Sequence, residues 1–146
     1  MSQYLLDTDW IVDVLNGQDA AIQTLIKLAP SGLALSLISY GELYEGAYFS
    51  RDPRTALEVL RTFLEGKELL PLTPAIMEQF ALIRGRLSKQ LRRQIGDTDL
   101  LIAATALHHD LVLLTRNLKD FQHIPNLKLY STSGKSAQCY RGRQAR

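Results

Sequence analysis

The sequence predicts a single α/β domain built on a mainly parallel β-sheet, and three observations support this. Short apolar runs alternate with longer segments of helical period, as in βα units. The chain has 146 residues, 46% of them hydrophobic, which suits one domain with a sizeable core. The run Leu-Val-Leu-Leu at 111–114 has no polar alternation, as expected for a strand buried on both faces of a parallel sheet.

Local signals place the elements of the first half of the chain. An apolar strand at 4–6 ends abruptly at Asp7. Asn16-Gly17 closes a short helix, and Pro30-Ser31-Gly32 stops a second one before a buried strand. Asp52-Pro53 begins a later helix. The expected helices cover residues 11–15, 19–28, 38–49 and 52–64, and the expected strands cover residues 33–36 and 69–70.

In the second half, Thr73 and Pro74 are a helix cap and a first-turn proline. Apolar residues at 76, 80, 83, 87 and 91 form one stripe, which predicts a single helix up to Gly96. Asp97 then caps an apolar helix that runs to about residue 108. After the strand at 111–114, residues 127–130 form a last edge strand.

Basic residues are concentrated in two places. Residues 79–96 contain five cations and no carboxylate, and there is no acidic residue after Asp120. On a helical wheel, four of the cations lie opposite the apolar stripe, and they favour a polyanionic partner, nucleic acid above all: Arg86, Lys89, Arg92 and Arg93. A solvated helix face is the alternative interpretation. We expect residues 1–130 to form the folded domain and residues 131–146 a basic, mobile tail.

Several classes of protein are excluded. Cys139 is the only cysteine, so an internal disulfide and a cysteine zinc cage are ruled out. The longest apolar run is far too short to span a bilayer. The first residues lack the basic start and long apolar stretch of a signal peptide. We therefore expect a cytoplasmic protein that does not associate with membranes.

Acidic side chains stand at the positions where α/β proteins bind ligands, beyond the carboxyl ends of the strands. Asp7 follows the first strand, Glu42 lies early in the helix after the second, and Asp99 lies at the start of the apolar helix. Parallel strands would bring them into one pocket, together with Asn117 or Asp120. Carboxylates held together repel one another unless a cation joins them. Oxygen ligands favour Mg²⁺ or Mn²⁺ over zinc.

Each carboxylate also has a simpler explanation. Asp97 is a good N-cap, and the helix dipole alone would favour Asp99 in the first turn. Asp9 and Asp13 suit an early helical turn, and Asp9 is the better site candidate of the two because it lies closer to the strand end.

Four motifs in order resemble the PIN domain, and within it the toxin ribonucleases of VapC type. The motifs are Leu-Leu-Asp-Thr at 5–8, the segment from Ser36 to Leu43 with its glutamate, Asp-Leu-Leu-Ile-Ala-Ala-Thr-Ala at 99–106, and Leu-Thr-Arg-Asn at 114–117 with Phe121. Together they cover almost the whole chain from residue 3 to residue 130.

The resemblance implies a three-layer α/β/α sandwich and an endoribonuclease that depends on Mg²⁺ or Mn²⁺. It makes Asp7, Glu42 and Asp99 metal ligands, with Thr8 and Thr115 as hydrogen-bonding neighbours. It also implies a homodimer and a cognate antitoxin. Many PIN domains have a fourth aspartate where this chain has Asn117, so Asn117, Asp120 or Asp97 completes the site.

Two other functions remain open at this point. Asp7-Thr8-Asp9 after a strand is also typical of phosphatases of the haloacid dehalogenase type, although Trp10-Ile11 departs from their pattern. A catalytically silent module that keeps the fold and binds RNA is the second alternative.

Overall fold

The computed structural model describes residues 1–131 and 138–141, and its centre is a six-stranded sheet in the order β3-β2-β1-β4-β5-β6. The first five strands are parallel, and β6 runs antiparallel to β5. The strands are β1 (Tyr4–Leu6), β2 (Leu33–Ser36), β3 (Glu68–Leu70), β4 (Val112–Leu114), β5 (Lys128–Ser131) and β6 (Gln138–Arg141).

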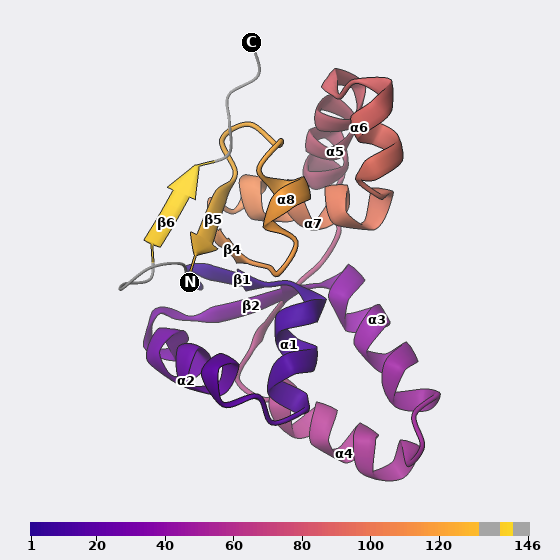
Figure 1. The fold of residues 1–146 in the computed structure, drawn as a ribbon, viewed down its shortest axis with the longest axis vertical. Coiled ribbons are helices and arrows are strands. Elements are labelled where there is room, and N and C mark those ends of the chain that lie inside the picture. Colours follow the sequence, from indigo (N-terminus) through magenta and orange to yellow (C-terminus); the bar gives the residue numbers. More distant parts are fainter. Residues whose placement is uncertain (132–137, 142–146) are drawn as a thin grey trace.

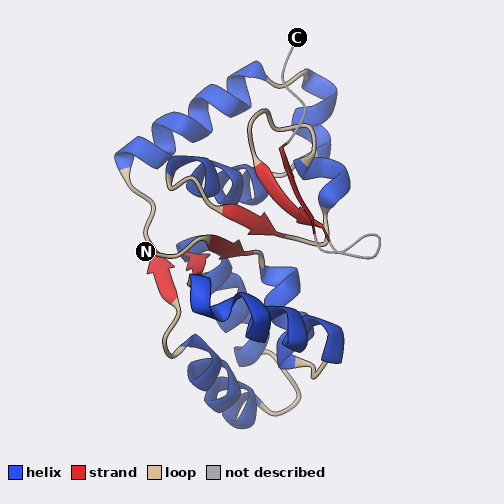
Figure 2. Cartoon of the chain, turned by 90° about the vertical axis from the view of Figure 1, so that its left-hand side faces the viewer, coloured by secondary structure: helices blue, strands red, loops and turns tan. Residues whose placement is uncertain are grey.

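Helices cover both faces of the sheet, so the fold is the expected three-layer α/β/α sandwich (Figures 1 and 2). One face is covered by α1 (Thr8–Leu15), α2 (Asp19–Leu28), α3 (Leu37–Tyr48) and α4 (Pro53–Leu64). The other face is covered by α5 (Pro74–Arg86), α7 (Asp97–His108) and α8 (Leu118–Phe121). The short helix α6 (Lys89–Gln94) joins α5 to α7 and has no buried residue. Leu5 packs into the core beneath α5 and α7, whereas Leu6 packs into the core of the opposite layer. Among the helices of the described residues, none has the length and hydrophobicity of a transmembrane segment.

The strand register sets the positions of the polar loops. Leu6 pairs with Leu114, so the next residues, Asp7 and Thr115, leave neighbouring strands at the same level. The Asp7 N–H donates to the Leu114 carbonyl at 2.9 Å. On the other side of β1, strand β2 ends at Ser36, whose hydroxyl caps α3 by accepting from the Ser39 N–H at 3.2 Å. Three chain segments therefore begin at one edge of the sheet.

The single helix expected up to Gly96 is wrong, because the chain breaks after Arg86 and restarts as α6. Ser88 caps the new helix and accepts a hydrogen bond from the Leu91 N–H at 3.2 Å. A serine competes for backbone hydrogen bonds and favours such a cap over a helix interior. The apolar stripe continues across the break because Leu87 still packs against the core. Arg86 and the three cations of α6 consequently do not share one helical face.

The C-terminal region also departs from the expectation. Strand β5 extends to Ser131 and is not the edge of the sheet, because β6 pairs with it from within the region expected to be a mobile tail. The sequence 138–141, Gln-Cys-Tyr-Arg, is too short to give a clear strand signal. Residues 132–137 and 142–146 of that region lie outside the described residues. The division of the chain at residue 130 stays a prediction.

Candidate active site

Asp7 is the most buried carboxylate at this edge of the sheet, with 6% of its surface exposed. It is the N-cap of α1, and its Oδ1 accepts from the Thr8 N–H at 2.8 Å. Its Oδ2 accepts from the Thr115 hydroxyl at 2.7 Å. Burial, followed by the nearby charge of Asp9, raises the pKa of Asp7 to about 7 despite these hydrogen bonds.

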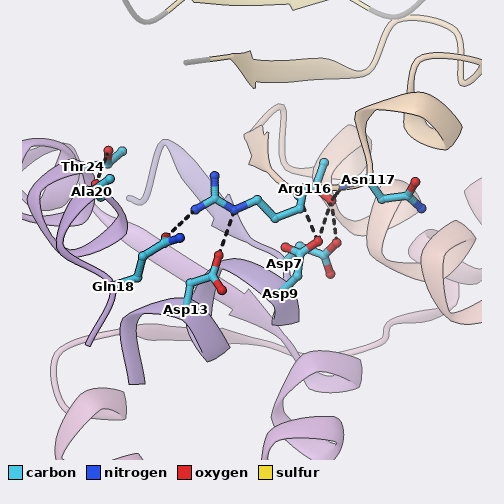
Figure 3. Close-up of polar contacts among 9 residues, drawn as sticks. Asp7, Asp9, Asp13, Gln18, Ala20, Thr24, Arg116 and Asn117 are labelled. Carbon is cyan, nitrogen blue, oxygen red and sulfur yellow. Dashed lines mark hydrogen bonds and ion pairs between the residues drawn. The ribbon is translucent and has the colours of Figure 1, made fainter. Parts of the chain in front are cut away.

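Asp9 lies beside Asp7 and faces the loop that follows β4 (Figure 3). Its Oδ2 accepts from the Arg116 main-chain N–H at 2.9 Å. Its Oδ1 is buried and has no hydrogen-bond partner within the described structure. Burial raises the pKa of Asp9 as well. The chain therefore holds two adjacent carboxyl groups in surroundings that oppose their ionisation.

Asp99 reaches the site from the first turn of α7 and is linked to the β4–α8 loop. The Asn117 side-chain amide donates to Asp99 Oδ2 at 3.4 Å and to Asp120 Oδ2 at 3.0 Å. Gln94 donates to the other Asp120 oxygen at 2.6 Å. Burial raises the pKa of Asp99, and the charges of Glu42, Asp120 and Asp9 add to the effect.

Glu42 approaches from α3 on the exposed side of the site. Its Oε1 accepts a hydrogen bond of 2.9 Å from the Thr8 hydroxyl. The side chains of Asp7, Asp99 and Glu42 thus reach the same edge of the sheet, with Thr8 and Thr115 hydrogen-bonded to two of them.

One expectation about the surroundings of the site is wrong. Asp97 does not cap α7, because Gly96 holds the N-cap position. Asp97 is exposed and forms an ion pair with Arg84, with its Oδ1 2.9 Å from Arg84 Nε. Within the described structure, Asp97 makes no hydrogen bond to the residues that contact Asp99.

The cations predicted to bind RNA lie on the exposed surfaces of two helices. Arg86 lies on α5, and Lys89, Arg92 and Arg93 lie on α6.

The donor set suits a hard divalent cation, since it consists of carboxylate oxygens. Burial raises the pKa of Asp7 to about 7, and no cation of the described residues acts against that shift. The charge of Arg116 lowers the pKa of Asp9 but only partly offsets the effect of its burial. Among the described residues, no group of three or more His, Cys, Asp or Glu side chains is arranged so that it could hold a metal ion by itself. This arrangement fits Mg²⁺, which usually takes one or two protein carboxylates and keeps several waters.

The raised pKa of Asp7 predicts that stability depends on pH. The folded protein retains the Asp7 proton up to about pH 7, whereas the unfolded chain releases it near 3.8. In that interval the native state binds more protons, so this contribution to the free energy of unfolding falls as pH rises, by about 4 kcal/mol in total. We expect metal-free wild type to lose stability relative to Asp7→Asn between pH 4 and pH 7 in urea unfolding. If the free energy of unfolding changed with pH in the same way in both proteins, the raised pKa of Asp7 would be contradicted.

Comparison with known proteins identifies the family. The model of the PIN domain matches residues 4–127. The chain belongs to the PIN domain family. This PIN domain is 31% identical to "Ribonuclease VapC2" of Haemophilus influenzae over 128 residues. The matched region covers 88% of this chain and 96% of the relative. It is 26% identical to "tRNA(fMet)-specific endonuclease VapC" of Shigella flexneri, with the same shares of each chain covered.

Solved structures with this PIN fold include toxin–antitoxin complexes. VapBC2 from Rickettsia felis, bound to a DNA fragment from its promoter, superposes with a TM-score of 0.77 at 30% identity, over 86% of this chain and 96% of that one. DNA-bound VapBC from Salmonella typhimurium gives a TM-score of 0.77 at 28% identity, over 88% and 97%.

Sequence reasoning missed one residue at this site. The sequence places Arg116 within a motif and indicates no role for it, yet its backbone contacts Asp9 and its side chain contacts α1. A lone arginine after a strand carries no signal that tells which helix it will reach.

Proposed function

We propose that this PIN domain is a metal-dependent endoribonuclease and the toxin of a toxin–antitoxin pair. The observation that carries the proposal is the group of carboxyl groups with raised pKa values at the carboxyl edge of the parallel sheet, of which Asp7 is the most buried. The ribonuclease names of its relatives support RNA as the substrate class. The VapBC complexes among its structural neighbours support a cognate antitoxin and a toxin role.

In this proposal Asp7, Glu42 and Asp99 hold Mg²⁺ or Mn²⁺, directly or through water. A bound divalent ion would activate water and stabilise the charge that develops on the phosphodiester. Thr115 and the Thr8 N–H hold the two oxygens of Asp7, and the Thr8 hydroxyl orients Glu42. These hydrogen bonds are the outer partners that fix ligand orientation in metal sites.

Asp120 is our choice for the fourth acidic residue. Asn117 bridges Asp120 to Asp99 through its side-chain amide, so the two residues together occupy the place of the missing aspartate. Asp97 is the weaker candidate because Arg84 already neutralises it.

The antitoxin would bind next to this site. A groove of about 300 Å³ lies between α1, α3 and α4, and Glu42 forms part of its wall. Apolar side chains line most of it, including Val12, Leu43 and Val59. An antitoxin segment lying there would cover Glu42 and restrict access to the carboxylates.

We also propose that the protein forms a homodimer, as its resemblance to VapC toxins implies.

The phosphatase alternative requires Asp7 to act as a nucleophile. Both oxygens of Asp7 accept short hydrogen bonds, and the residue is buried. This environment favours an orienting or ligand role over attack on a phosphoryl group. Trapping of an aspartyl-phosphate on Asp7 would nevertheless establish the phosphatase.

The second alternative is a catalytically silent module that binds RNA. RNA binding with the same affinity with and without metal, and with and without the Asp7 carboxylate, would establish it.

We propose that the cations of α6 contact the RNA backbone. Phosphate contacts release counterions, so each lost contact reduces the salt dependence by about 0.7 in log–log slope for single strands. Replacing both Arg92 and Arg93 with Ala should flatten the slope and weaken binding similarly across RNA sequences. The measurement is fluorescence anisotropy on labelled transfer RNA and on a homopolymer, at several salt concentrations.

The control carries Arg51→Ala and Arg54→Ala, which remove one exposed cation just before α4 and one in its first turn, in the other helical layer. A third protein with Arg143→Ala and Arg146→Ala tests the C-terminal cations without removing β6. An unchanged slope in the α6 variant would show that its cations are only solvated surface. A change confined to the third protein would assign the RNA contacts to the C-terminal region.

A further inference from the structure

The side chain of Arg116 joins the loop after β4 to α1 and to the turn that follows α1. Its Nε lies 2.9 Å from Asp13 Oδ2, and its Nη2 donates to Gln18 Oε1 at 3.0 Å. The guanidinium group stacks over the Trp10 ring, with Cζ 4.0 Å from the ring centroid. One planar cation thus makes three contacts in different directions, which suits arginine and not lysine.

The backbone of the same loop contacts the carboxylates. The Arg116 N–H donates to Asp9 at 2.9 Å, and the preceding Thr115 hydroxyl donates to Asp7 at 2.7 Å. The following Asn117 contacts Asp99. Three consecutive residues therefore touch three acidic side chains, and the residue in the middle anchors the loop.

We propose that Arg116 is a positioning residue that fixes the Thr115–Asn117 loop, and through it the carboxylates, in the geometry that binds the metal. The proposal rests on the proposed function of the site. Arg116 is not a catalytic residue, because its guanidinium extends away from Asp7 and Asp9 toward Gln18 (Figure 3). Trp10 is buried in the core and provides a rigid surface for the stack.

We expect the domain to stay folded without this anchor. The Arg116 and Asp13 side chains are 39% and 32% exposed, and ion pairs at such positions contribute little to stability. Removal of the guanidinium group should therefore loosen the loop while leaving the domain folded. Local loosening of this kind is measurable by amide hydrogen exchange.

The test compares Arg116→Ala and Arg116→Lys with wild type. Arg84→Ala is the matched control, because it removes another half-exposed ion pair of 2.9 Å from the opposite helical layer. Amide exchange at residues 116 and 117 is followed by NMR in metal-free protein, and calorimetry gives the dissociation constant of Mn²⁺. We expect faster exchange and about tenfold weaker Mn²⁺ binding in Arg116→Ala, the magnitude typical of lost outer partners of a metal site. Arg116→Lys should recover only part of both, and Arg84→Ala should resemble wild type.

Amide exchange rates that do not change in Arg116→Ala would overturn the anchoring role, whether or not the dissociation constant of Mn²⁺ changes. Faster exchange with unchanged Mn²⁺ affinity would overturn the link from the loop to the site. Full recovery by Arg116→Lys would show that charge alone suffices and would contradict the three-contact geometry. If wild type itself binds no Mn²⁺, the proposed metal site fails, and the exchange data still decide whether Arg116 anchors the loop.

Discussion

Asp7→Asn should abolish metal-dependent RNA cleavage, lowering the rate at least a hundredfold, while the metal-free protein unfolds at a higher temperature than wild type at pH 7. The substitution removes a ligand charge, which removes activity. It also removes a buried negative charge that has no protein cation against it, which favours the folded state. Cleavage of total transfer RNA in Mg²⁺ or Mn²⁺, measured alongside thermal unfolding, gives both quantities.

Glu42→Gln and Asp99→Asn should lose activity in the same assay, because they remove the other two proposed ligands. Two controls isolate the effect of position from the effect of charge. Asp19→Asn changes an exposed acid at the start of α2, and Glu45→Gln changes an exposed acid on the same helix as Glu42. Both controls should retain wild-type cleavage. Equal losses in a control and in its partner would show that the effect is not specific to the site.

Mg²⁺ or Mn²⁺ should raise the melting temperature of wild type but not that of Asp7→Asn. A ligand that binds only the native state stabilises it by about 2.7 kcal/mol at one hundred times its dissociation constant. For a domain of this size that corresponds to a shift of about 8 °C. Differential scanning fluorimetry over a metal titration measures the shift, with Asp19→Asn as the control that should follow wild type. The same shift in Asp7→Asn would place the metal elsewhere.

The position of the site could be predicted from the sequence because it follows from chain topology. Asp7 and Thr115 directly follow apolar strands, and parallel pairing of Leu6 with Leu114 brings them together. Glu42 and Asp99 lie in early turns of α3 and α7, which their helical period predicts, although the cap expected at Asp97 is wrong. Strand ends and helix starts are encoded within a few residues, so a single sequence is enough to place them.

Features that depend on contacts between distant segments could not be predicted. The break at Ser88 is different, because the serine is a local cap signal, but the apolar stripe that continues across the break predicts one helix. Asp97 is of a residue type that often caps helices, but its side chain forms an ion pair with Arg84 of another helix. The three contacts of Arg116 depend on how α1 packs against β4. Such contacts depend on the tertiary packing of the chain and leave no pattern in the local sequence.

The most direct test of the central claim is cleavage of RNA by the purified full chain, first in EDTA and then after addition of excess Mg²⁺ or Mn²⁺, with Asp99→Asn measured in parallel. Total transfer RNA is the substrate, and denaturing gels report the products. A carboxylate-held metal site predicts no cleavage by either protein in EDTA and cleavage by wild type alone once the metal is added. Cleavage that persists in EDTA, or full activity of Asp99→Asn with metal, would contradict the account.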